Sequence, residues 1–163
     1  MMEPSAECAA AIVDDEIGPE ELEKIKNKYE TQLERGQPAC SVMFDYGAAL
    51  IRSPKPDNIR LGLKLLEQLC KIDEEDVEKR AYVYFLAIGH TKLKNYDDAT
   101  KFIKFLLNNE PENYQAQCLL ALIEKRMKKD GLVGAAIVGG VFMVSGFVGL
   151  GVLAGIHALK RKG

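Results

Sequence analysis

The sequence lacks the motifs on which most enzymes depend. It contains no P-loop and no HExxH motif, and it has two histidines among its 163 residues. His90 is the only histidine outside a long apolar stretch near the C-terminus, so a histidine-based catalytic pair has no evident partner. We therefore expect a protein that is not an enzyme and that holds no cofactor or metal ion.

Closely spaced cysteine pairs are also missing. No CxxC pair occurs and the cysteines are far apart, which favours neither a zinc site nor a disulfide framework. We expect them to be small apolar side chains in a reducing compartment, with Cys8 exposed. The four cysteines are Cys8, Cys40, Cys70 and Cys118.

Charged side chains are absent from residues 131–159, although they occur every few positions before this stretch. About 20 apolar residues, at about 1.5 Å each, cross a membrane core of about 30 Å. A domain this small could not cover every face of such a helix, which argues against a buried soluble helix. The sequence therefore predicts a single-pass tail anchor followed by a short basic tail, residues 160–163, with the preceding domain in the cytosol. Basic residues precede the anchor, as expected of a cytosolic flank, at Lys125, Arg126, Lys128 and Lys129.

Basic residues are missing from the first 23 positions, which contain eight acidic side chains. Residues 24–130 carry 19 basic and 16 acidic side chains, and 19 − 16 gives them a net charge of +3. This contrast predicts an acidic arm, residues 1–18, that can fold back on a domain at residues 19–130. A solvated, disordered end fits the composition equally well.

Sustained alternation of apolar and polar residues is absent, so we expect an all-α fold. Apolar residues recur instead at helical spacing, and glycine, proline or asparagine separates the runs. The pattern predicts a bundle of about six helices before the anchor, at residues 19–35, 39–51, 57–70, 74–94, 97–109 and 113–129.

Two of these predicted helices align with each other at an offset of 37 residues, with Gly62 and Ala99 at corresponding positions. Each follows a helix rich in tyrosine and phenylalanine, so the repeated unit is a helix pair. A period of about 34 residues, with a small residue where the helices cross, is typical of tetratricopeptide repeats. We expect the outer helices to cap the repeats, because two repeats alone would leave apolar faces exposed.

Three segments carry a more specific likeness. They are residues 82–89 (YVYFLAIG), 94–99 (KNYDDA) and 127–140 (MKKDGLVGAAIVGG). With the helix order and the basic tail, the chain from about residue 20 onward resembles the mitochondrial fission 1 protein family. The resemblance implies a receptor on the cytosolic face of the mitochondrial outer membrane, and of peroxisomes, that acts in organelle division. Its implied partners are a dynamin-related GTPase, adaptors of that GTPase, and regulators of Rab GTPases or of mitophagy. No nucleic-acid partner is expected.

The first helix of each stacked pair lines the concave side of such an array, where a peptide or a partner helix can bind. Leu50 and Phe85 could equally be core residues, and basic side chains there could be ordinary surface charges. By resemblance to the family's concave surface, the candidate groove contacts are Leu50, Arg52, Tyr82, Phe85 and Lys92.

The acidic arm itself offers a ligand for this groove. Ile12, Val13 and Ile17 would supply apolar contacts. The acidic side chains would meet Arg52 or Lys92. We hypothesise that the arm competes with partners for the groove.

Two alternative functions stay open. One is a tail-anchored chaperone or import co-receptor that binds acidic C-terminal peptides, which would need several basic and amide side chains in the groove. The other is a structural anchor that bends membranes by oligomerising. Gly151 and Gly155 form a GxxxG pair that allows close helix packing and a homo-oligomer. The bases that resemble the targeting tail of an outer-membrane anchor are Lys160, Arg161 and Lys162.

Overall fold

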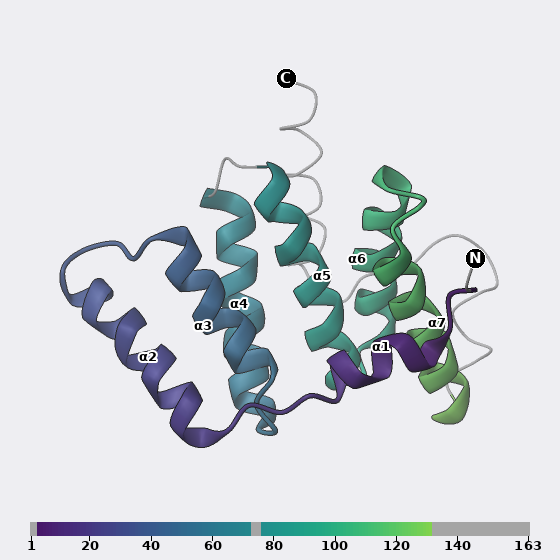
Figure 1. Ribbon diagram of the computed structural model, residues 1–163, viewed down its shortest axis with the longest axis horizontal. Coiled ribbons are helices and arrows are strands. Elements are labelled where there is room, and N and C mark those ends of the chain that lie inside the picture. The colour runs from purple at the N-terminus through teal and green to yellow at the C-terminus, as the bar shows by residue number, and fades with distance from the viewer. Residues whose placement is uncertain (1–2, 73–75, 132–163) are drawn as a thin grey trace.

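Figure 1 shows the computed structural model, which describes residues 3–72 and 76–131. The predicted all-α class is confirmed, and six of the helices correspond to the six predicted ones. The sequence pattern missed a seventh, the short helix in the N-terminal arm. The helices of the described residues are α1 (Ala6–Val13), α2 (Pro19–Glu34), α3 (Cys40–Ile51), α4 (Pro56–Ile72), α5 (Asp76–Lys92), α6 (Tyr96–Asn109) and α7 (Tyr114–Lys129).

Particular residues at the helix ends explain where several of the helices begin and end. Helix α2 starts with Pro19 and has two acidic residues in its first turn, which suits the positive end of the helix dipole. It ends before Gly36, whose φ of +136° is a conformation that favours glycine. The side chain of Asn113 caps α7 by accepting the N–H of Ala116 at 3.0 Å.

Two helix pairs stand side by side in the centre of the structure (Figure 1). Helices α3 and α4 form the first pair, α5 and α6 form the second, and α4 packs against α5. Helix α2 covers α3 at one end of the row and α7 covers α6 at the other. This order is the one predicted for two repeats with a capping helix at each end. Large aliphatic side chains from both pairs are fully buried, among them Ile51, Leu66, Leu86 and Ile103, and so is Ile123 of α7.

The first pair crosses closely at two glycines. A Cβ atom added to Gly62 of α4 would lie 2.7 Å from the carbonyl oxygen of Gly47 in α3 and 3.0 Å from side chains of Ile51 and Leu50. Real Cβ atoms do not approach a backbone oxygen so closely, so the two helices could not keep this separation. The small residue expected at the crossing is therefore required by contact with the backbone of the neighbouring helix.

In the part of the chain that the structure describes, no helix is both long and apolar enough to span a membrane. The predicted anchor at residues 131–159 lies outside the described residues except for Gly131. The residues assigned to helix packing and targeting also lie outside them, namely Gly151, Gly155, Lys160, Arg161 and Lys162.

We predict that Gly62→Ala destabilises the domain by about 1–3 kcal/mol, because the new methyl group must push α3 away from α4. Helix propensity alone would give the opposite sign, since alanine favours a helix interior over glycine. Gly18→Ala is the control for a methyl group added in open space, because an added Cβ there meets nothing within 4 Å. Since Gly18 is the N-cap of α2, this variant should cost less than about 1 kcal/mol. Urea unfolding followed by circular dichroism measures both variants. A Gly62→Ala variant as stable as the parent would contradict the close crossing.

Candidate functional site

The N-terminal arm turns back on the domain and places α1 against α7 and α5 (Figure 1). Its buried face consists of Ala6, Ala9 and Val13, which are three and four residues apart and so share one side of the helix. Ile17 continues the contact beyond the helix with 5% of its surface exposed. Its backbone N–H donates to the carbonyl oxygen of Arg52 at 3.1 Å. The arm is thus fixed to the domain by small apolar side chains and by its backbone.

A disulfide bond joins Cys8 of α1 to Cys118 of α7, with 6.0 Å between their Cα atoms. This corrects the expectation that no disulfide forms and that Cys8 is exposed. Cys8 is half-buried, and Cys118 is 2% exposed. The two lie 110 residues apart in the sequence, and they meet only because the arm returns to α7. Sequence spacing alone therefore could not reveal the bond.

Ion pairs accompany this disulfide on the surface of α7. The Glu7 carboxylate accepts a hydrogen bond from Nζ of Lys125 at 2.6 Å, which lowers the pKa of Glu7 below its usual value. The Asp14 carboxylate accepts from Nη2 of Arg126 with both oxygens, at 2.6 and 2.7 Å. The sequence pattern assigned these two bases to the flank of the membrane anchor. The structure shows that they also hold the arm.

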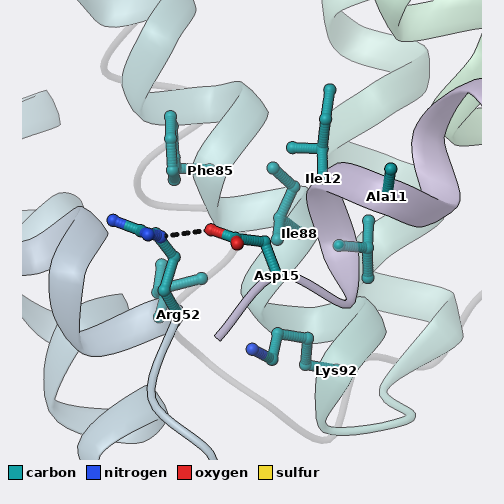
Figure 2. Close-up of a pocket in the computed structure, with 9 residues that line it drawn as sticks. Ala11, Ile12, Asp15, Arg52, Phe85, Ile88 and Lys92 are labelled. Carbon is teal, nitrogen blue, oxygen red and sulfur yellow. Dashed lines mark hydrogen bonds and ion pairs between the residues drawn. The ribbon is translucent and has the colours of Figure 1, made fainter. Parts of the chain in front are cut away.

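A cavity of about 260 Å³ lies at the C-terminal end of α1, where the arm meets α3 and α5 (Figure 2). Asp15 lines the cavity and accepts a hydrogen bond from Nε of Arg52 at 2.6 Å (Figure 2). Nη1 of Arg52 also lies 3.6 Å from the carboxylate of Glu21. The residues that line the cavity are Ala11, Ile12, Val13, Asp15, Ile51, Arg52, Phe85, Ile88 and Lys92.

Three of the five predicted groove residues come together in this cavity, namely Arg52, Phe85 and Lys92. The other two are buried, with Leu50 2% exposed and Tyr82 1% exposed. Leu50 belongs to the hydrophobic core. The ring of Tyr82 lies 5.2 Å from that of Phe44, measured between centroids. In this arrangement neither Leu50 nor Tyr82 offers a surface to a partner.

The sequence reasoning missed Ile51 and Ile88 as lining residues. Ile88 follows Phe85 by three residues, so it shares a helix face with a predicted groove residue, and this spacing is a usable signal. Ile51 had no such signal, because it ends an almost wholly apolar helix whose core and groove sides look alike in sequence.

Lys92 is a basic side chain whose positive charge is only partly offset by nearby acidic groups. Its Nζ is buried and has no hydrogen-bond partner among the described residues. Desolvation lowers the pKa of Lys92, and the carboxylates of Glu16, Asp14 and Asp15 act in the opposite direction. An acidic group of a ligand would stabilise the charged form of this lysine. Within the described residues, no cluster of histidine, cysteine or acidic side chains is arranged to hold a metal ion.

Comparison with known proteins assigns the chain to a family. Residues 42–73 match the model for the Fis1 N-terminal tetratricopeptide repeat, and residues 80–132 match that for the C-terminal repeat. Over 152 residues the chain is 43% identical to the mitochondrial fission 1 protein of Bos taurus and 42% identical to that of Homo sapiens. Each alignment covers 93% of this chain and 98% of the relative. The chain belongs to the mitochondrial fission 1 family. This family of tetratricopeptide-repeat proteins is not a family of enzymes.

Solved structures of the family share the fold. Fis1 from Saccharomyces cerevisiae aligns with a TM-score of 0.65 and 25% identity, covering 81% of this chain and 97% of that one. Yeast Fis1 in complex with a fragment of Mdv1 aligns with a TM-score of 0.66 and 24% identity, covering 80% and 98%. The tetratricopeptide fold expected from the repeat pattern is therefore confirmed, and the name of the family ties it to mitochondria.

We predict that Arg126→Glu loosens the arm, because it replaces the ion pair with Asp14 by repulsion between two carboxylates. Backbone amides of α1 should then exchange about five-fold faster with deuterium under reducing conditions, where the disulfide is absent. Lys128→Glu is the matched control on the same helix, since it makes the same charge change at an exposed position. Exchanging the charges with Asp14→Arg and Arg126→Asp together should restore slow exchange. Unchanged exchange in Arg126→Glu would count against the ion pair.

Proposed function

We propose that the chain is a tail-anchored adaptor of the mitochondrial outer membrane, and of peroxisomes, that promotes fission by capturing a partner in the groove that the arm now occupies. The partner is a dynamin-related GTPase or an adaptor that recruits it, and regulators of Rab GTPases belong to the same class of candidate. The observation that carries the proposal is the cavity in which Arg52, Phe85 and Lys92 face residues of the arm.

The arm indicates the chemistry that the groove accepts. Ile12 and Val13 place aliphatic side chains at the cavity, and the carboxylate of Asp15 accepts a hydrogen bond from Arg52. A partner segment with aliphatic residues followed by acidic ones would make the same contacts, and a further acid could reach Lys92. The arm would then be a competitor that a partner must displace.

The apolar stretch at residues 131–159 supports the membrane part of the proposal. A groove carried on an anchored domain is held at one surface, so its partners become concentrated there. That yeast Fis1 has been crystallised with a fragment of Mdv1 supports a binding role for the shared fold. The lining of the cavity is mainly aliphatic and aromatic with two bases, which favours this partner class over the strongly basic groove of an acidic-peptide chaperone.

We predict that deletion of residues 1–18 from the full chain in liposomes increases capture of the dynamin-related GTPase of the same organism by about ten-fold, because the intramolecular competitor is gone. Capture is measured by liposome co-sedimentation under reducing conditions, with and without fission adaptors. Lower capture after the deletion would contradict competition and make the arm part of the binding site.

In the arm-deleted chain, Arg52→Glu should reduce capture to near background, since it repels the acidic part of the partner. Arg60→Glu is the control, because Arg60 is exposed on α4 and pairs with Asp57 of the same helix. Equal capture by the Arg52→Glu and Arg60→Glu variants would contradict the assignment of Arg52 to the binding groove. Preference for acidic C-terminal peptides over the GTPase and its adaptors would favour the chaperone alternative.

The basic tail gives a separate prediction about location. Replacing Lys160, Arg161 and Lys162 by serine removes the charges that would select the outer membrane and should move a fluorescent fusion to the endoplasmic reticulum. The control replaces Lys128 and Lys129 by serine, which changes charge on the other flank of the span and leaves the ion pairs of the arm in place. Retention of the tail variant at mitochondria, judged by microscopy, would contradict a targeting role for these bases.

A further inference from the structure

We infer that Cys8 and Cys118 form a reversible thiol–disulfide latch that locks the arm over the groove when the chain is oxidised. The inference rests on the proposed function, because closing the groove matters only if the groove binds a partner. It concerns a different event, however, namely the opening and closing of α1.

The placement of the two cysteines meets the requirements of a disulfide. Their Cα atoms lie 6.0 Å apart, within the range that native disulfides span. Cys8 is on α1, which opens and closes, and Cys118 is on α7 of the domain, which keeps its place. Cys118 is buried under the arm, whereas Cys8 is half-buried on α1 and offers a reductant a route to the bond.

Without the disulfide, the arm is held by contacts that are individually weak. Helix α1 has eight residues, too few to be stable alone, and two of its three buried side chains are alanines. Its ion pairs join exposed carboxylates to Lys125 and Arg126, and such pairs contribute little in water. The reduced arm can therefore detach and reattach. A covalent bond at Cys8 keeps α1 beside α7 and prevents that detachment.

The repeats do not need this bond. Their core is made by large aliphatic side chains of α3 to α7, and the disulfide adds a link from α7 to the arm alone. Reduction should therefore release the arm and leave the domain folded. A disulfide whose reduction frees the arm but leaves the domain folded differs from the structural disulfides that stabilise small folds.

The chemistry balances with hydrogen peroxide as oxidant. The Cys8 thiolate attacks one peroxide oxygen, forming a sulfenic acid and releasing hydroxide, which takes up a proton to give water. The Cys118 thiolate then attacks the Cys8 sulfur and expels a second hydroxide, so two thiols and one peroxide give one disulfide and two waters. A dithiol reductant of the thioredoxin class reverses the step by attacking Cys8 and leaving Cys118 as a thiol. A chain that faces the cytosol meets both kinds of reagent, and there the reduced form predominates until oxidant appears.

The test uses the full chain in liposomes, treated with either hydrogen peroxide or dithiothreitol. Mass spectrometry of thiol-trapped peptides identifies the cysteines that pair. Hydrogen exchange then compares the backbone amides of α1 in the two states, with the amides of α4 as an internal reference. We expect the Cys8–Cys118 disulfide in the oxidised chain and exchange of α1 slowed about ten-fold or more.

A labelled arm peptide, residues 3–18 with serine in place of Cys8, reports whether the groove is open. It should bind the reduced chain about ten-fold more tightly than the oxidised one. Cys8→Ser should make binding independent of redox state, whereas the control Cys40→Ser should keep the full redox response. A redox response that survives Cys8→Ser, equal α1 exchange in both states, or a bond that resists excess dithiothreitol under native conditions would each overturn the latch. If α1 responds as expected but the fission partner is not captured by either form, the proposed function fails and the latch stands.

Discussion

The contact between α1 and α7 joins the N-terminal arm to the last helix of the domain, and the closed arrangement of the groove depends on it. The contact holds residues of the arm in place as one wall of the cavity, whose other walls come from α3 and α5. It brings Glu7 and Asp14 to the bases of α7, and it pairs Cys8 with Cys118. Its apolar part is narrow and consists largely of alanine, so the closed arrangement relies on several modest interactions acting together.

The helices that stack into repeats were predictable because each has a long apolar stripe bounded by a clear stop. Helix α6 illustrates this, with buried apolar residues at helical spacing between Asn95 at its N-cap and Pro111 just after its end. Helix α1 was not predictable by that route. It is only eight residues long, its buried face is made of small side chains, and acidic residues surround it, so its sequence also fits a disordered end.

Part of the candidate site could also be predicted from the sequence. The resemblance to the family named Arg52 and Phe85 as groove residues, and the structure places both at one cavity. Helical spacing shows only which residues of a single helix share a face. It does not show whether that face meets solvent or a neighbouring helix. Tyr82 is a groove residue by resemblance to the family's concave surface, yet its ring packs beside Phe44 inside the domain. The disulfide lay beyond any local pattern, since its two cysteines come together only through the tertiary fold.

The disulfide also has a mechanical consequence. It closes a covalent ring that runs from Cys8 through both repeats to Cys118. A force applied between the N-terminus and the end of α7 would pass through the bond and the last turns of α7 and would bypass the helices inside the ring. In the reduced chain the same force would pull directly on the repeats, beginning with the contact between α1 and α7. Oxidation would therefore change how much load the repeats bear when the chain is pulled at its N-terminus and at the end of α7.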